Sequence, residues 1–317
     1  MFITINKYIY ISCKFILGNL MKYILAVDIG GTTFNSGLFS DSFNQIDVSE
    51  KDKIRFYSNK KSNVAQGIIN QINLLIENNN IDKKNILGLG IAAPGPLDPV
   101  KGKILNTPNL KIFSNYNIAD DFAKKLKIHT YLENDANLFA MGEWYTQYRK
   151  NSVMLGITLG TGLGFGLVVN KKLFTGGNGM AMEYGLSPFK WGLAEENVSI
   201  RFLKEKAKSM YGRVISPRSV EKKFFLNDDK AVCIYNEFGE NLGLVLSHVI
   251  NMIDPQVITI GGGLSKAFEC FEESMNLSIK KFSPSFNKNQ IIIAPSKFRE
   301  LSTMIGACIM VKNKNKF

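Results

Sequence analysis

Two glycine-rich segments that follow apolar runs could hold phosphate groups. The first is Asp28-Ile29-Gly30-Gly31-Thr32-Thr33, which follows Tyr23–Val27, and the second is Gly160-Thr161-Gly162-Leu163-Gly164, which follows 152–159. Glycines at a strand end let the backbone turn tightly and bring N–H groups against anionic oxygens, and threonine hydroxyls add donors. The carboxylate of Asp28 could reach a phosphate-bound metal ion, directly or through water. For the first segment alone, a simple hairpin turn is the alternative.

A candidate for proton transfer lies between these segments, in Glu133-Asn134-Asp135-Ala136-Asn137. Asp135 stands between an expected strand at 128–132 and an expected helix that begins near Ala136, and a helix N-terminus favours a charged carboxylate. Such a side chain could accept the proton of a hydroxyl group. The alternative is that Asp135 only caps the helix. The two roles are compatible, because capping would also aim the side chain.

Alternating strands and helices must position these residues. Residues 23–27 and 36–39 are expected to form a hairpin, with 53–57 as a third antiparallel strand. The apolar spacing of 64–78 is typical of a helix that covers a sheet, and 86–93 is a buried strand that ends at Pro94. Further helices are expected at 118–126, 136–149, 199–211, 219–225, 230–235 and 238–252, and further strands at 128–132, 152–159, 165–169 and 257–260.

The second half of the sequence repeats the plan of the first. The two hairpin turns lie about 130 residues apart, and the strand at 257–260 leads into a third glycine turn, Gly261-Gly262-Gly263. Ligands of such folds bind at the carboxyl ends of the strands. We therefore predict an α/β fold with a cleft between two duplicated domains. The smaller domain is expected to comprise 21–134 with 300–317, and the larger domain 135–299.

The composition is that of a globular protein. A chain of 317 residues with 45% hydrophobic content can bury a core in each of about two domains. The formal net charge of +12 comes from lysines that are spread along the chain, many of them beside asparagine. No basic helix with interleaved aromatic residues is visible, so we expect no nucleic-acid partner.

The cysteines and the N-terminal segment limit the choice of compartment. The four cysteines, Cys13, Cys233, Cys270 and Cys308, are far apart in sequence and have no neighbouring cysteine or histidine. This spacing indicates neither a zinc site nor disulfides and favours a cytoplasmic location. The longest apolar run in residues 1–20 is too short to span a bilayer, so we expect no membrane association. We expect residues 1–20 to be an extension outside the fold.

Seven segments in a fixed order make the chain resemble the ROK (repressor, open-reading-frame, kinase) family of sugar kinases, which have the actin-like, Hsp70-like ATPase fold. They are the three glycine turns, Gly90–Asp98, Thr107–Leu110, Glu133–Asn137 and Glu183–Gly185. The resemblance covers about residues 21–310. It implies a two-domain actin-like (ribonuclease H-like) fold and a glucokinase-like activity, the ATP- and Mg²⁺-dependent phosphorylation of a hexose, glucose to glucose 6-phosphate above all. A homodimer is also a family expectation.

The resemblance also implies roles for individual residues. Asp135 would be the catalytic base. Sugar contacts are implied for Asn109, Asn134, Asp135, Glu183 and Glu195, although a one-residue shift would exchange Glu195 for Glu196. Nucleotide contacts are implied for Asp28, Gly30, Gly31, Thr32, Thr33, Gly160, Thr161, Gly162, Gly261, Gly262 and Gly263. Among these, Asp28 would hold Mg²⁺ through water, and the last three glycines would leave space for adenosine.

One segment departs from the family pattern. Family members commonly continue Glu-x-Gly with a histidine and a cysteine-rich segment that together bind a structural zinc ion. Here Leu186 stands at the histidine position and Ser187–Ala194 replaces the cysteines. We therefore expect no zinc site, and we expect Phe189 and Trp191 to pack there instead.

Other functions compete with catalysis. A sugar-binding regulator or sensor of the same family would lack kinase activity, but the DNA-reading members carry a helix-turn-helix domain, and only 20 residues precede Met21. An actin-like filament former is a further alternative, without a visible assembly surface. The sequence does not choose among glucose, fructose, mannose and N-acetylated amino sugars, or between ATP and polyphosphate as the phosphoryl donor.

Overall fold

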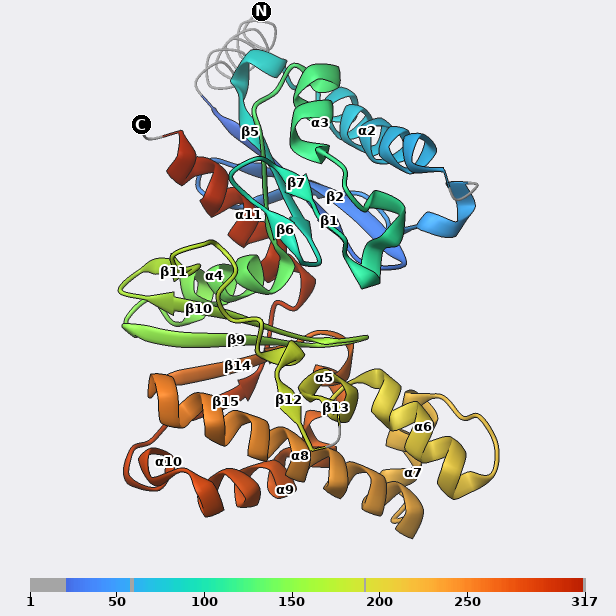
Figure 1. Cartoon of the computed structure of the whole chain (residues 1–317). Coiled ribbons are helices and arrows are strands. Elements are labelled where there is room, and N and C mark those ends of the chain that lie inside the picture. Colours follow the sequence, from blue (N-terminus) through green and yellow to red (C-terminus); the bar gives the residue numbers. More distant parts are fainter. Residues whose placement is uncertain (1–20, 58–59, 191, 316–317) are drawn as a thin grey trace, which may run out of the picture. The chain divides into compact units, whose positions relative to one another are not determined.

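The chain divides into two compact units. The computed structural model describes residues 21–57, 60–190 and 192–315 (Figure 1), so the extension expected at residues 1–20 lies outside the described residues. The first unit runs up to Asn134 and also includes the residues from Ala307 onward. The second unit is Asp135–Gly306.

The main sheet of the first unit combines antiparallel and parallel strands. Its strands are β1 (Tyr23–Ile29), β2 (Thr33–Ser40), β3 (Gln45–Val48), β4 (Asp52–Lys53), β5 (Ile86–Ala93) and β8 (Thr130–Asn134). The order is β3-β2-β1-β5-β8, and β4 pairs with β2 outside this order. Strands β1, β2 and β3 are antiparallel, whereas β5 and β8 continue parallel to β1. The central strands are continuous apolar runs because helices cover both of their faces.

Two helices cover one face of this sheet, and helix α11 (Glu300–Lys314) covers the other (Figure 1). Helices α2 (Lys61–Asn78) and α3 (Ile118–Leu126) share a buried apolar core with β1, β2 and β5. On the opposite face, Ala307 of α11 lies against Gly90 of β5. Shorter elements are η1 (Ile54–Tyr57), η2 (Lys83–Asn85), η3 (Pro108–Phe113), β6 (Leu97–Asp98) and β7 (Lys103–Ile104).

The third antiparallel strand is not the one that the sequence predicted. Residues 53–57 were expected to form it, but β3 takes this place, and η1 follows β4 as a single 3-10 turn. The side chain of Tyr57 explains the turn, because its hydroxyl donates to the carboxylate of Asp52 and its ring packs on Phe34. These contacts bend the chain back over β2 instead of letting it extend.

The second unit repeats the same sheet. Its strands are β9 (Val153–Leu159), β10 (Leu163–Val169), β11 (Lys172–Phe174), β14 (Val257–Gly261) and β15 (Ile292–Pro295). Their order is β11-β10-β9-β14-β15, with β9, β10 and β11 antiparallel and β14 and β15 parallel to β9. Each unit therefore has the same strand order and the same strand directions, as the duplicated plan of the sequence predicted.

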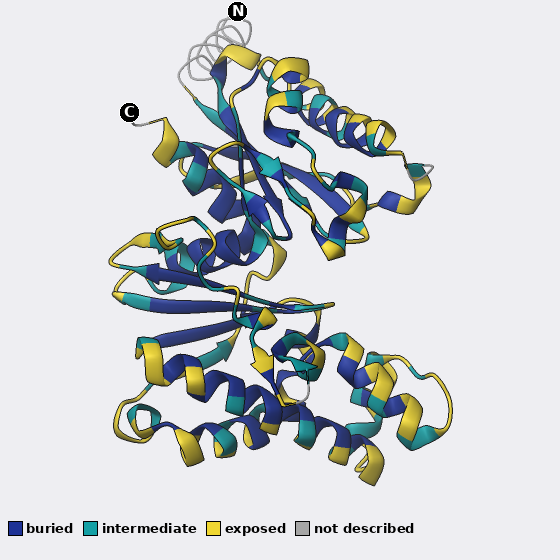
Figure 2. Cartoon of the chain, viewed as in Figure 1, coloured by how far each residue is buried: buried dark blue, intermediate teal, exposed yellow. Residues whose placement is uncertain are grey.

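Helices also cover both faces of the second sheet (Figure 1). Helix α4 (Asp135–Gln147) lies on one face, and α8 (Asp229–Ile253) and α9 (Phe268–Phe282) pack on the other. The outer sides of α8 and α9 are exposed, whereas most of α4 is buried (Figure 2). The remaining elements are η4 (Tyr184–Leu186), β12 (Pro188–Phe189), β13 (Gly192–Leu193), α5 (Ala194–Asn197), α6 (Ile200–Tyr211), α7 (Pro217–Phe224), η5 (Gly263–Ala267) and α10 (Pro284–Lys288).

Helix α8 corrects a second prediction. Separate helices were expected at 230–235 and 238–252, but α8 is continuous over both ranges. No proline or helix-ending residue lies between them, and the Asp228 side chain caps the start of α8 by accepting from Ala231 N–H.

In the part of the chain that the structure describes, no helix is long and apolar enough to cross a membrane.

Candidate active site

The first glycine turn closes the hairpin of β1 and β2. The N–H of Gly30 donates to the carbonyl oxygen of Thr33 over 2.8 Å, and Gly31 and Thr32 are exposed. Thr33 is already the first residue of β2 and pairs with Lys53 of β4. Asp28 lies near the carboxyl end of β1, where the register places it between β2 and β5. A carboxylate and an exposed glycine turn therefore occur at the same strand end.

A second candidate residue lies against this turn. A Cβ atom at Gly31 would be only 2.5 Å from the carbonyl oxygen of Asn109, which belongs to η3. This close approach requires glycine at position 31 and brings Asn109 next to the turn. The structure thus joins two segments that are far apart in sequence, the first glycine turn and the Thr107–Leu110 motif.

The second glycine turn closes the hairpin of β9 and β10 in the other unit. The N–H of Gly160 donates to the carbonyl oxygen of Gly162 over 3.0 Å, and Thr161 is exposed. No atom lies within 4 Å of a Cβ position at Gly160. The packing of the protein therefore does not require glycine at this position, whereas the close approach of a ligand to the backbone would.

The third glycine turn, at the end of β14, lies beside the second. A Cβ atom at Gly262 would be 2.3 Å from the carbonyl oxygen of Leu159, and its φ of 78° favours glycine. A Cβ atom at Gly261 would collide with the ring of Phe139 in α4. At Gly263 the nearest atom is an ordinary van der Waals neighbour, 3.8 Å away. The first two glycines have a packing role, so Gly263 is the position with free space.

Asp135 lies close to the second turn because of how α4 packs. Asp135 is the first residue of α4, and Ala136 lies directly against Gly164 at the start of β10. The N–H of Ala136 donates to Asp135 Oδ1 over 2.8 Å. Burial raises the pKa of the Asp135 carboxyl, and this backbone hydrogen bond opposes the shift. The structure therefore places a carboxylate of increased basicity beside the glycine turn.

Glu183 approaches the same place from η4. A Cβ atom at Gly185 would be 2.2 Å from the carbonyl oxygen of Leu163, so η4 lies against the start of β10. Partial desolvation raises the pKa of Glu183, and the negative charges of Asp135 and Glu195 raise it further. Asp135 and Glu195 therefore lie near enough to Glu183 for their charges to act on it. Such a cluster suits a neutral polyol, because carboxylates accept hydrogen bonds from hydroxyl groups.

The adjacent residues Glu195 and Glu196 have different surroundings in the structure. The carboxylate of Glu196 accepts from the N–H of Leu193 over 2.9 Å, and it thereby caps the start of α5. Glu195 is partly buried and is the one whose charge reaches Glu183. The geometry thus favours Glu195 over Glu196 as the residue that faces the cluster.

Asn134 is the last residue of β8 and belongs to the first unit. It pairs with Ala93 of β5, and its N–H donates to Glu133 Oε1 over 2.7 Å. The candidate residues are therefore divided between the units. The first carries Asp28, Gly30, Gly31, Thr32, Thr33, Asn109 and Asn134, and the second carries Asp135, Gly160, Thr161, Gly162, Glu183, Glu195, Gly261, Gly262 and Gly263.

The family model described as the ROK family matches residues 24–314. The chain belongs to the ROK family. Among its relatives, a glucokinase of Thermotoga maritima is 27% identical over 92% of this chain and 98% of the relative. An N-acetyl-D-glucosamine kinase of Histophilus somni is 28% identical over 91% of this chain and 98% of the relative.

Solved structures show the same fold. A ROK family glucokinase from Streptomyces griseus, solved in complex with glucose and AMPPNP, has a TM-score of 0.77. It is 21% identical, and the match covers 92% of this chain and 98% of the other. The fold is therefore the two-domain actin-like ATPase fold of the ROK sugar kinases, as the sequence predicted.

The segment where many ROK proteins carry cysteines is a short hairpin here. Strands β12 and β13 pair through Phe189 and Gly192, and Phe189 is buried. Trp191, which was expected to pack beside Phe189, lies outside the described residues. Among the residues that are described, no group of three or more histidine, cysteine, aspartate or glutamate side chains could hold a metal ion.

One buried residue of this ROK protein, Glu143, was not predicted from the sequence. Glu143 lies in α4 and is fully buried, and its carboxylate accepts hydrogen bonds from Ser296, Ser302 and Gln147. Burial raises its pKa, and these hydrogen bonds oppose the shift. The available signal was a glutamate inside an apolar helical run. Glu143 fixes the helix that begins with Asp135 against the segment after β15 and the start of α11.

Proposed function

We propose that the protein transfers the γ-phosphoryl group of ATP to a hydroxyl group of a hexose, and that glucose is the first substrate to test. The observation that carries this proposal is that the start of α4, with Asp135, and η4, which follows Glu183, both pack against the start of β10 beside the second glycine turn. The charge of Glu195 also acts on Glu183. The two relatives support a sugar kinase, and because they act on different sugars they leave the choice of hexose to experiment.

Asp135 is the proposed general base. As the sugar oxygen bonds to the phosphorus atom, its proton moves to the carboxylate of Asp135, and the bond from phosphorus to the ADP oxygen breaks. A carboxyl group with a raised pKa is a better proton acceptor than an ordinary aspartate, provided that it is ionised at the working pH. Its place at the start of α4 fixes its direction.

Glu183 and Glu195 are the proposed sugar ligands of the second unit, and Asn109 and Asn134 are those of the first. Carboxylates accept hydrogen bonds from hydroxyl groups, and amides both donate and accept them. Within each unit, such groups can hold the hydroxyl groups of a neutral polyol in a defined orientation. We infer that Glu183 and Glu195 aim one hydroxyl group at Asp135.

The two hairpin turns are the proposed phosphate contacts. The free space above Gly160 would allow a phosphate oxygen to approach the backbone, and Gly263 would leave space for the adenosine. Asp28 would hold Mg²⁺ through water, since a carboxylate oxygen at a strand end is a ligand type that this ion accepts. When bound, Mg²⁺ offsets the charge that develops on the phosphate oxygens.

A panel of hexoses and amino sugars, each combined with ATP or polyphosphate, tests this function. Formation of sugar phosphate and release of ADP are measured together for glucose, fructose, mannose, N-acetylglucosamine and N-acetylmannosamine. We expect ADP release that depends on at least one of these sugars and matches the sugar phosphate formed. Saturable sugar binding without phosphorylation would favour the alternative, a sugar-binding regulator or sensor. The proposal would be contradicted if the protein neither bound nor phosphorylated any of these sugars.

A further inference from the structure

Both proposed sugar glutamates lie in one segment that contains little regular structure. This acidic segment, residues 183–197, consists of η4, the two-residue strands β12 and β13, and the single turn α5. Elements this short do not hold a side chain in place by themselves. Because binding requires Glu183 and Glu195 to keep a defined spacing, contacts from a longer element must fix the segment.

Asn241 of α8 provides the first such contact. Its side chain is 2% exposed, and both ends of its amide group are engaged. Asn241 Nδ2 donates to the carbonyl oxygen of Asn197 over 3.3 Å, and Asn241 Oδ1 accepts from Lys190 Nζ over 2.5 Å. Lys190 precedes Glu195 and Asn197 follows it. One buried amide therefore holds the chain on both sides of this glutamate.

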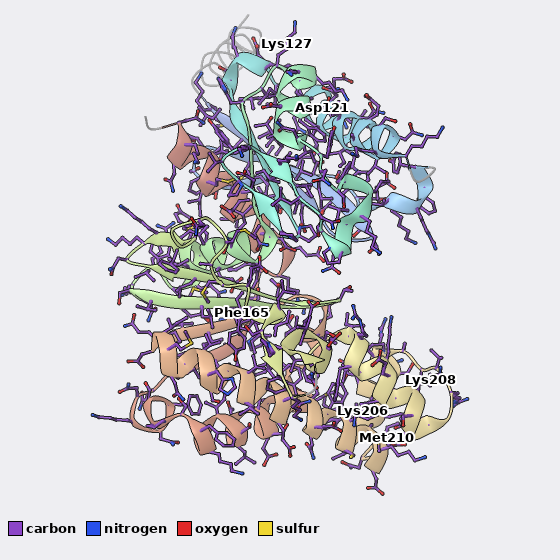
Figure 3. The ribbon with its side chains drawn as sticks, in the orientation of Figure 1. Asp121, Lys127, Phe165, Lys206, Lys208 and Met210 are labelled. Atoms are coloured by element: carbon purple, nitrogen blue, oxygen red, sulfur yellow. The ribbon has the colours of Figure 1, made fainter. Side chains whose placement is uncertain are left out.

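His248 of α8 provides the second contact. It lies seven residues after Asn241, which is about two helical turns, so the two side chains leave the same side of α8. His248 Nδ1 and the hydroxyl of Tyr184 are hydrogen-bonded at 2.6 Å. The ring of Tyr184 also packs edge-on against Phe165 of β10, which is labelled in Figure 3, with ring centroids 5.8 Å apart. Tyr184 directly follows Glu183.

Helix α8 is itself held firmly. It packs against α9 so closely that a Cβ atom at Gly243 would lie 2.4 Å from the carbonyl oxygen of Met275. A helix pair in such close contact cannot slide without a collision. The acidic segment is thus attached to one of the more rigid parts of the second unit.

We propose that Asn241 and His248 are positioning residues that set the spacing of Glu183 and Glu195 and thereby determine sugar affinity. This inference rests on the proposed function, because it takes these two glutamates as the sugar ligands. It goes beyond that function by placing control of sugar binding in α8, outside the carboxylate cluster. Neither residue belongs to a motif that the sequence analysis identified.

The test compares Asn241→Leu and His248→Leu with a matched control on the same helix. Asn251 also makes a side-chain hydrogen bond, but to the carbonyl oxygen of Phe282, so Asn251→Ala serves as the control. For both test variants we expect amide hydrogen exchange in 183–197 to become about tenfold faster, and KM for the sugar to rise about tenfold. We expect kcat and KM for ATP to stay within about threefold of wild type, and the control to match wild type.

A rescue variant separates positioning from general destabilisation. In His248→Asn, the side-chain amide can accept from or donate to the Tyr184 hydroxyl, so it can replace His248 Nδ1 in either direction of the bond. Exchange in the segment and KM for the sugar should therefore return toward wild type. Tyr184→Phe should match His248→Leu, and the double variant should add nothing further, because all remove the same hydrogen bond. His248 is exposed, so its variants keep the test valid even if Asn241→Leu does not fold.

The outcomes separate this inference from the proposed function. Unchanged exchange in 183–197 together with an unchanged KM for the sugar would overturn the positioning role, and so would equal changes in the KM values of sugar and ATP. If the wild-type protein phosphorylates no sugar, the proposed function fails on the wild type alone. In that case, amide hydrogen exchange and calorimetric measurement of sugar binding still decide whether Asn241 and His248 hold the segment.

Discussion

The two glycine turns occupy the same place in two sheets of the same topology, yet their surroundings differ. Strands β1 and β9 even share one pattern of buried and partly buried residues. Two residues before the first glycine of each turn, β1 carries Asp28 and β9 carries Thr158. The first turn is packed against Asn109, whereas the second has free space above Gly160. The two turns thus share a backbone plan and differ in their chemistry.

This difference indicates a division of roles between the two turns. The first turn combines the carboxylate of Asp28 with a fixed backbone. The second combines an open backbone with nearby carboxyl groups, those of Asp135, Glu183 and Glu195. Under the proposed function, the first unit supplies Asp28 for Mg²⁺ and the two sugar amides, and the second supplies the base and the two sugar carboxylates.

The largest expected effect comes from the base in the second unit. Asp135→Asn should lower kcat by about 10³-fold, within the usual range of 10²–10⁴ for the loss of general base catalysis. KM for the sugar should change little, because the amide can still form a hydrogen bond. Steady-state kinetics measures both quantities. Asp229→Asn is the matched control, because Asp229 is also the first residue of a helix but is exposed on α8. Turnover near wild type in Asp135→Asn would refute the assigned base.

A smaller effect is expected when the chemical difference between the two turns is removed. Asp28→Asn should lower kcat/KM by about 10- to 100-fold and raise the Mg²⁺ concentration needed for half-maximal rate, since a metal-linked carboxylate is lost. Thr158→Val, at the corresponding position of β9, should leave the Mg²⁺ requirement unchanged. A Mg²⁺ titration of both variants makes the comparison. Equal effects would mean that the two turns do not differ in this role.

Much of the first unit could be predicted because its signals are local. The hairpin of β1 and β2 follows from apolar runs on either side of Gly30 and Gly31. The strand predicted at 53–57 was wrong because a contact between Tyr57 and Asp52 decides the local structure, and no periodicity in the sequence reports such a contact. The break predicted within α8 was wrong because a polar pair, Asn236-Glu237, does not end a helix.

The second unit was harder to predict because its candidate site depends on contacts between distant residues. Motif order indicated Glu183 but left Glu195 and Glu196 exchangeable, and the cap of α5 now distinguishes them. The parts played by Glu143 and Asn241 could not be found from spacing, because each is defined by partners far away in sequence.

Adding a methyl group to each turn should sharpen the contrast between the packed turn and the open turn. Gly31→Ala places a Cβ atom 2.5 Å from a carbonyl oxygen, so it should reduce the free energy of unfolding by about 1–3 kcal/mol. Gly160→Ala should leave stability unchanged and raise KM for ATP about tenfold, because the methyl group fills the space that a phosphate needs. Urea unfolding and ATP kinetics, measured on both variants, distinguish the two effects. Equal losses of stability would contradict the proposed role of Gly160.

The smallest expected effect is a shift in the pH dependence of the second unit. Burial raises the pKa of Asp135 above its ordinary value of 3.8. The base acts only when ionised, so kcat/KM should fall as the pH decreases through this raised pKa, and the acid limb should lie above pH 3.8. Glu183→Gln removes a negative charge that interacts with Asp135. This should move the limb down by less than about one pH unit, since burial is the main cause of the Asp135 shift. A limb at or below pH 3.8 in the wild type would mean that the titrating group is not Asp135.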